Sequence, residues 1–525
     1  MRFLTGGPGA GHGARLRAGL TVGAAALTVA LPANADVTPA EVWDDLSELL
    51  EGVGYEVSVT ESVSGGNLML GDLTLRMAIP ESEDQSAGDV TLGLADLTLE
   101  DLGDGTVGLR FPSPMPIEVR VTEEGTEPVE MTLELAQDGL SLVASGDPDA
   151  LNYAYSAEAT RLELVRLLAE GKELSRDVFS ASLATGPLSG NSEVATTDGK
   201  RRYSHSYQAD ELRYDLSGSD PEQSDSTGQV SGRVTGLTSR GESVIPEVDP
   251  NSDAAAIMGA GFEGSGTLTF DSGQTTFALT DGGETMTGSS SSQGGSLEGA
   301  IDGTRMSYAF GLKALSYEAE GGDLPFPVSA AVDELALNLS MPLAKSDTPQ
   351  DMALGVTLGG LTLSDAIWGI FDPGATLPRD PATLAFDLTG KVTPLVSVFD
   401  PAGLTRLEQE DAAPAELNAL TLNSLTLSAA GAKITGQGEV AFNQEDTESF
   451  GGMPAPEGKV TFNLSGANGL IDKLIAMGLL SQQDAMGARM MLGMFTVPGS
   501  EPDTQTSTIE MNDQGQILAN GQRIK

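Results

Sequence analysis

Residues able to act as a general base or nucleophile are scarce in this sequence. It has no cysteine and two histidines, and only His205 lies outside the N-terminal leader described below. A Ser-His-Asp arrangement would have to use His205, yet no G-x-S-x-G elbow is present. His205 lies in the alternating run of residues 203–207. That run predicts an exposed histidine on a strand rather than a catalytic base.

Motifs for cofactors and metals are missing too. The sequence contains no GxxxxGK[ST], no GxGxxG entering a helix, no HExxH and no complete calcium loop. The lack of cysteine also excludes thiolate metal sites. We therefore expect no enzymatic activity, no cofactor and no metal. With 76 acidic residues, a hydrolase that uses a carboxylate pair is the least favoured alternative.

The N-terminus has the pattern of a cleavable signal peptide over residues 1–35. Three arginines and no acid precede Asp36, and residues 18–31 form an apolar run of 14 residues. Ala33 and Ala35 supply the small residues that signal peptidase accepts, which predicts cleavage before Asp36. The alternative is a membrane anchor, but spanning a bilayer takes roughly 20 residues. No Arg-Arg pair precedes the run, so we expect Sec-type export to the periplasm.

Charge restricts the partners of the exported chain. The formal net charge of the full sequence is −48, and removal of the three arginines of the leader makes it −51; a charge of this sign repels nucleic acid and anionic lipid head groups. Solubility in a crowded compartment is the preferred explanation of this charge, and a cationic partner or an atmosphere of divalent cations is the alternative. After the leader no apolar run approaches 18 residues, so we expect no transmembrane span once the signal is removed.

Alternation of apolar and polar residues dominates from residue 55 onward. It predicts strands with one buried and one wet face, hence an antiparallel sheet. We expect a mainly β fold, an elongated and twisted multi-stranded sheet with a few amphipathic helices packed on it. A curled or half-barrel form is an alternative, because long sheets tend to curl. Residues 36–525 are predicted to form one large domain, with two β subdomains meeting within 261–303 as the alternative.

A short pattern, L-x-x-L-T-L, recurs at irregular spacing. It occupies residues 70–75, 94–99, 358–363, 417–422 and 422–427. The irregular spacing is unlike a leucine-rich solenoid of fixed period. We interpret the pattern as a repeated way of building a strand, in which the last three residues alternate on the sheet and the first leucine precedes a local kink or crossing.

Helical spacing predicts one helix after the leader and two near the C-terminus. Residues 38–41 read as a capping box, and Trp43 beside the following apolar stripe is interpreted as a core anchor. The C-terminal pair has apolar faces that predict core packing, with contact to an apolar ligand as the alternative. The candidate ligand contacts are Leu470, Leu474, Met486, Met490, Met494 and Phe495.

Several segments together resemble one protein family. They are residues 35–46, 324–343 and 361–390, together with the C-terminal helices and the ending GQILANGQRIK. The chain resembles, from about residue 35 to its end, exported Gram-negative proteins catalogued as domain of unknown function 2125. The resemblance implies a periplasmic location and brings no catalytic residues. The ending is also similar, at fold level only, to periplasmic β proteins of the AsmA type, which are linked to envelope lipid traffic.

For function we therefore expect a non-catalytic periplasmic protein of the cell envelope, with a structural or interaction role. The alternative is a protein that binds or transports lipid or another apolar ligand. An apolar face without side-chain partners would favour the lipid function, and a filled interior would favour the structural one. The sequence names no specific protein or lipid partner.

Overall fold

The computed structural model describes residues 36–79, 87–220, 225–248, 252–410 and 412–525. Ala33 and Ala35 lie outside this range, and Asp36 is its first residue. Within the described residues there are six helices and a single sheet of thirty strands, which confirms the mainly β prediction.

The helices are short. They are α1 (Pro39–Gly52), α2 (Ala254–Gly259), α3 (Asp365–Phe371), α4 (Pro401–Gln409), α5 (Ala467–Ala476) and α6 (Gln482–Phe495). None in the described ranges is both long and apolar enough to cross a membrane.

The strands lengthen towards the middle of the chain. The first fifteen are β1 (Glu56–Ser64), β2 (Asn67–Ile79), β3 (Gly88–Leu94), β4 (Leu97–Asp101), β5 (Val107–Arg110), β6 (Met115–Glu123), β7 (Val129–Asp138), β8 (Ser141–Asp147), β9 (Ala150–Ala157), β10 (Ala159–Ala169), β11 (Lys172–Leu174), β12 (Phe179–Thr185), β13 (Leu188–Thr197), β14 (Lys200–Ser219) and β15 (Thr227–Pro246). The others are β16 (Glu263–Phe270), β17 (Ser272–Asp281), β18 (Glu284–Ser292), β19 (Gly295–Asp302), β20 (Arg305–Gly321), β21 (Val328–Pro342), β22 (Gln350–Leu363), β23 (Ala382–Pro394), β24 (Ala415–Ala429), β25 (Ala432–Asn443), β26 (Ala455–Ser465), β27 (Val497–Pro498), β28 (Thr504–Met511), β29 (Ile517–Ala519) and β30 (Gln522–Arg523).

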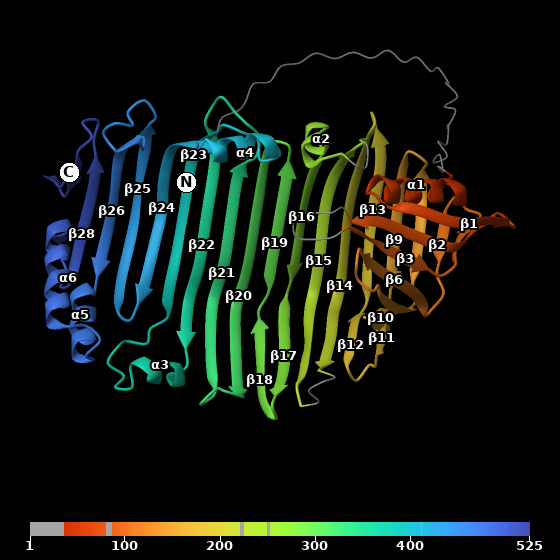
Figure 1. Ribbon diagram of the computed structural model, residues 1–525, viewed down its shortest axis with the longest axis horizontal. Coiled ribbons are helices and arrows are strands. Elements are labelled where there is room, and N and C mark those ends of the chain that lie inside the picture. The colour runs from red at the N-terminus through yellow and green to blue at the C-terminus, as the bar shows by residue number, and fades with distance from the viewer. Residues whose placement is uncertain (1–35, 80–86, 221–224, 249–251, 411) are drawn as a thin grey trace, which may run out of the picture.

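The topology is an antiparallel meander. From β20 to β26 each strand pairs with its neighbours in sequence. Some long strands are broken in two, so that β16 and β17 both pair with β15, while β18 and β19 both pair with β20. The sheet thus continues through residues 261–303. Figure 1 shows the strands side by side, with β1 and β2 turned across them at the N-terminal end.

The copies of the L-x-x-L-T-L pattern coincide with further irregularities of the sheet. The pairing register shifts at or between the first two leucines in every copy, as at Leu358 and Leu361. Residues i and i+3 of a regular strand point to opposite faces, but one extra residue turns both to the same face. Leu70, Leu73 and Leu75 are accordingly all buried together. The predicted kink is a β-bulge that keeps one face apolar along the whole strand.

The buried core is concentrated at the N-terminal end, under α1. Val42 and Trp43 of the helix pack against Leu70, Leu99 and other residues of the curled strands. This placement confirms Trp43 as a core anchor, and its Nε1 donates to Glu61 at 3.0 Å. The predicted capping box, Thr38 with Glu41, is present at the start of α1.

Polar side chains also hold α1 to the sheet. The Asp45 carboxylate forms an ion pair with Arg201 on β14 and accepts a hydrogen bond of 2.6 Å from the Tyr153 hydroxyl on β9. Burial, followed by this hydrogen bond to Asp45, raises the pKa of Tyr153 far above its ordinary value. The phenol therefore stays protonated and keeps donating to the carboxylate.

Candidate apolar binding face

Apolar side chains line up across the middle of the sheet. Residues directly opposite each other in paired strands point to the same face. One row of mutually opposed residues crosses seven strands, from β16 to β24: Leu268, Leu297, Phe310, Leu337, Val356, Phe386 and Leu425. A parallel row two residues away contains Leu312, Leu335, Leu358, Leu384, Leu427, Ile434 and Leu464. Between β16 and β26 one face of the sheet is thus apolar.

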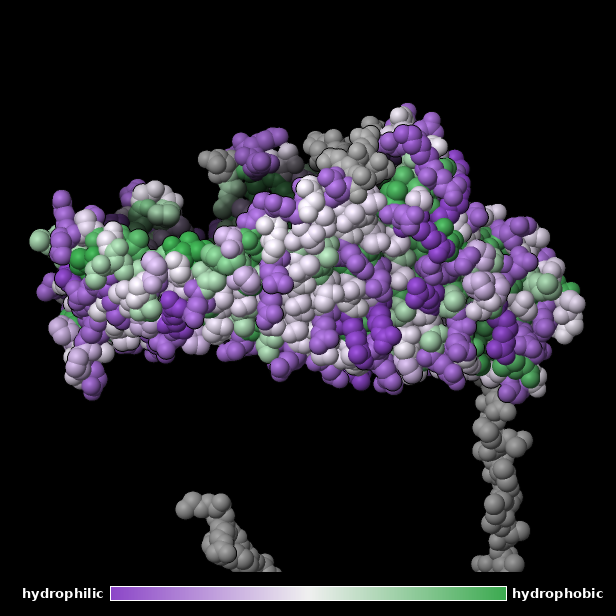
Figure 2. Space-filling view, turned by 90° about the horizontal axis from the view of Figure 1, so that it is seen from below, coloured by the Kyte–Doolittle hydropathy of each residue, from purple (hydrophilic) through white to green (hydrophobic). Residues whose placement is uncertain are grey.

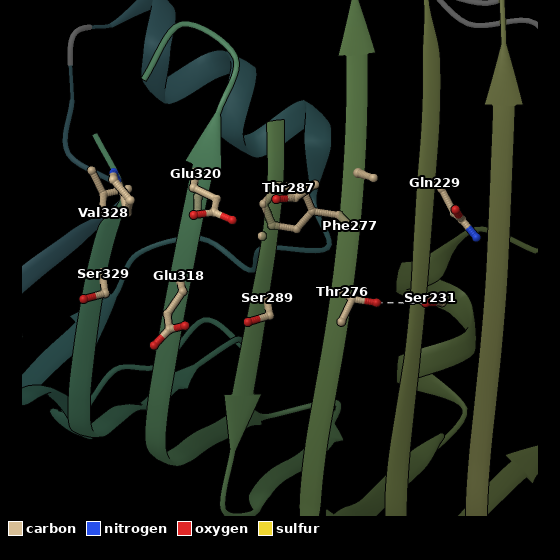
Figure 3. Close-up of a pocket in the computed structure, with 14 residues that line it drawn as sticks. Gln229, Ser231, Thr276, Phe277, Thr287, Ser289, Glu318, Glu320, Val328 and Ser329 are labelled. Carbon is tan, nitrogen blue, oxygen red and sulfur yellow. Dashed lines mark hydrogen bonds between the residues drawn. The ribbon is translucent and has the colours of Figure 1, made fainter. Parts of the chain in front are cut away.

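The opposite face is polar. Ser231, Thr276, Ser289, Glu318 and Ser329 oppose one another in a row across five strands. They line a shallow cavity of 730 Å³ (Figure 3), and the Ser231 and Thr276 hydroxyls hydrogen-bond at 2.9 Å. The sheet therefore has one solvent-exposed polar face, as the alternation predicted. The next feature to consider is what covers the apolar face.

Both ends of the apolar face are covered by helices. Leu339 lies on this face, two residues beyond Leu337, and its row runs through Tyr308, Gly299, Gly266, Gly241, His205 and Ser192 to Tyr153. Tyr153 belongs to the core beneath α1, so α1 stands on this face at the N-terminal end. At the C-terminal end α6 stands over Leu425 and Leu464.

Between these helices the face has no covering layer within the described residues. α2, α3 and α4 lie near the strand ends (Figure 1). Leu297, Tyr308, Leu384 and Leu427 remain 38%, 36%, 38% and 43% exposed. Hydrophobic surface gathers in hollows on the upper side of Figure 2, towards the C-terminal end at the left. A sheet normally buries its apolar face against a second layer, and monomers rarely expose a large contiguous apolar patch.

The C-terminal end of the face is roofed into a groove of 630 Å³. Its floor is Leu425, Ile434, Phe462, Leu464 and Ser507, which lies opposite Phe462 on β28. Its roof, on α6 and the residue after it, is Ala488, Met491, Leu492, Phe495 and Thr496. No charged side chain is among these ten residues, so the groove suits an apolar chain.

Hydrogen bonds and an ion pair position α5 and α6. The α5 N-terminus has no cap of its own, because glycine stands at its N-cap. Asp503, in the loop before β28, accepts instead from the backbone N–H groups of Asn468 at 3.1 Å and Gly469 at 2.9 Å. Burial raises the pKa of Asp503, but these hydrogen bonds outweigh it and hold the pKa below its ordinary value. Arg489 of α6 pairs with Asp472 of α5 at 2.5 Å.

The predicted contact residues fall in three places. Phe495 lines the groove, and its contact with an apolar ligand stays a prediction. Leu470 and Leu474 are half-buried on α5 and lie outside the groove lining. Met486, Met490 and Met494 point outward, so the expectation of core packing was wrong for them. The physical reason is that α6 is apolar on two sides, and Ala485, Ala488, Leu492 and Phe495 form the side that meets the sheet.

The groove floor was missed from the sequence. The alternation in residues 415–465 marks these side chains as members of an apolar face, but not as the part beneath α6. Strand register and the position of the helix decide that, and both depend on contacts between residues far apart in the chain.

His205 is not exposed as predicted, but half-buried on the apolar face. Its ring stacks on Tyr207 with centroids 6.0 Å apart, and its Nε2 lies 3.4 Å from the Ser239 hydroxyl. Within the described residues, no carboxylate hydrogen-bonds to this imidazole to orient it as a base. Across the same ranges, no three side chains converge as a metal site.

Comparison with known proteins gives a family but no activity. The model of one family, described as an uncharacterized protein conserved in bacteria (DUF2125), matches residues 265–517. Over this range the chain is similar to the DUF2125 family. The match is narrower than the resemblance in the sequence and omits α1 with its core. The DUF2125 region contains most of the open apolar face and the whole groove. No curated protein and no solved structure matches the chain.

Proposed function

We propose that this protein is a non-catalytic, exported protein of the bacterial cell envelope that binds the apolar chains of lipids on its open sheet face. The observation that carries the proposal is the apolar face from β16 to β26, which is uncovered as far as α6 and ends in a groove without charged lining. Export to the periplasm is part of the proposal and rests on the leader of residues 1–35. Of the functions expected from the sequence, this is the apolar-ligand alternative rather than the structural role.

The geometry favours a thin layer of acyl chains, rather than a second sheet, as the cover of the apolar face. Two sheets pack face to face about 10 Å apart, and a helix is itself about 10–12 Å across. Because α1 and α6 stand on the apolar face at its two ends, a second copy could not bring its face that close. Flexible acyl chains can fill a recess one helix deep. The net charge of −48 disfavours anionic head groups in this recess.

The test is binding of N-phenyl-1-naphthylamine, an uncharged apolar probe. Its fluorescence increases when it moves from water into an apolar site. Leu337 and Asn338 are neighbours on β21 that point to opposite faces, so Leu337→Asp and Asn338→Asp each add one charge at adjacent positions. We expect Leu337→Asp to weaken binding about tenfold or more, and Asn338→Asp to change it less than about twofold. Circular dichroism checks that both variants keep the sheet.

Equal probe binding by both variants would refute the proposal. Native mass spectrometry of protein isolated from cells gives a second measurement, since retained lipid appears as added mass. A tightly bound protein partner with no lipid would instead support the structural or interaction role.

A further inference from the structure

The outer side of α6 carries four exposed methionines. Met486, Met490, Met491 and Met494 are 72%, 65%, 60% and 56% exposed. Leu479 before the helix and Val497 after it extend the patch. A helix that is apolar on both sides is normally buried on both. The inner side of α6 meets the sheet, and within the described residues nothing covers the outer side.

The charge around this patch differs sharply from that of the whole chain. Residues 467–498 contain two acids, Asp472 and Asp484, and two bases, Lys473 and Arg489, which cancel, whereas the chain as a whole carries −48. Arg489 is paired with Asp472, and Asp484 accepts a hydrogen bond of 2.6 Å from the Ser481 hydroxyl. The α5–α6 pair is therefore an electrically neutral apolar surface on a strongly acidic protein.

We propose that the outer side of α6 docks into the interface of a lipid bilayer whose head groups carry no net charge. Methionine is unbranched and polarizable, so it adapts to irregular apolar surroundings such as lipid tails. A helix of 14 residues is about 21 Å long, which suits lying in the interface rather than spanning it. Anionic head groups are disfavoured because the remainder of the chain repels them.

Docking would place the groove against the membrane. Met491 is both part of the exposed patch and part of the groove lining. A bilayer that received the methionines would therefore lie next to the roofed end of the apolar face. This membrane contact goes beyond the proposed lipid-chain binding and does not depend on it, because Met486, Met490 and Met494 lie outside the groove lining.

The experiment is flotation of the full chain with phosphatidylcholine vesicles. We expect co-flotation that changes little between about 0.1 M and about 1 M salt, since hydrophobic contact is not screened. Vesicles that include phosphatidylglycerol should bind less. The double variant Met490→Glu/Met494→Glu should lose about tenfold or more of the binding.

The matched control is Val63→Glu/Met69→Glu, which adds two carboxylates to exposed apolar residues at the other end of the sheet. We expect it to float like the parent. Absence of flotation by the parent, or equal flotation by the α6 variant, would overturn the inference. So would analytical ultracentrifugation showing that the α6 variant only splits a dimer, because a second copy would then be the occupant. Probe binding at Leu337 is measured without vesicles, so the two proposals fail separately.

Discussion

Replacing Gly360 with alanine tests the bulge geometry that keeps one sheet face apolar. Gly360 lies in the L-x-x-L-T-L copy of β22 and has φ +68°, the left-handed region. A methyl group there would overlap the Asp333 carboxylate on β21. The left-handed backbone costs alanine roughly 1–2 kcal/mol, and moving the Asp333 side chain off its rotamer adds about 0.5–1.5 kcal/mol. We therefore expect Gly360→Ala to lower the free energy of unfolding by about 1.5–3.5 kcal/mol.

The assay is urea unfolding followed by far-UV circular dichroism, applied to a double-mutant cycle. Asp333→Ala removes the overlapping carboxylate, so Gly360→Ala made in that background should cost only the backbone contribution of roughly 1–2 kcal/mol. The matched control is Gly359→Ala. Its methyl group would meet Glu334 and Thr357 at 3.6 Å, an ordinary contact, and its φ is outside the left-handed region. This control should stay within about 1 kcal/mol of the parent.

Equal effects of Gly360→Ala and Gly359→Ala would refute the reasoning. In that case the chain would have no left-handed residue at 360, and Leu358 and Leu361 would not share a face through this bulge. A cycle without coupling between positions 360 and 333 would keep the bulge but reject the contact across the two strands.

Three further predictions follow from burial, hydrogen bonding and the leader. Met490→Ala and Met494→Ala should each lower the free energy of unfolding by less than about 1 kcal/mol in urea titrations, because both side chains are mostly exposed, whereas a fully buried methionine would cost about 2–5 kcal/mol. A larger loss would mean that α6 packs differently. Asp503→Asn, which keeps a residue that tolerates the left-handed φ of 51° at this position, should cost about 1 kcal/mol at neutral pH through loss of the ionised α5 cap. Because the folded pKa of Asp503 is below the unfolded value of about 3.9, this stabilisation is complete above that pH and disappears as the pH falls through the folded pKa. Acid titration of parent and variant should therefore converge at low pH, and a constant difference would argue against a role for the ionised carboxylate. Intact mass of protein isolated from the periplasm should match a chain that begins at Asp36, and an uncut leader on most molecules would contradict the export prediction.

Local patterns in the sequence determined the elements and their faces. Period-two alternation identified the strands, and helical spacing identified α1, α5 and α6, because both periods depend only on backbone geometry over a few residues. The L-x-x-L-T-L copies marked the bulges for the same reason. Leucines three apart can share an apolar face only where one extra residue interrupts the pleat. Trp43 could be predicted as a core residue because it adjoins a stripe that starts at a recognisable cap.

Only the tertiary structure decided what the apolar surfaces meet. The row through Leu337 exists because seven strands pair in one particular register, and register is a property of contacts between distant residues. Whether a second layer covers that row depends on where the few helices stand, which periodicity does not record. The methionines of α6 show the same limit. Periodicity identified an apolar side of the helix, but α6 has two such sides, and only its position over Leu425 and Phe462 leaves Met490 facing outward.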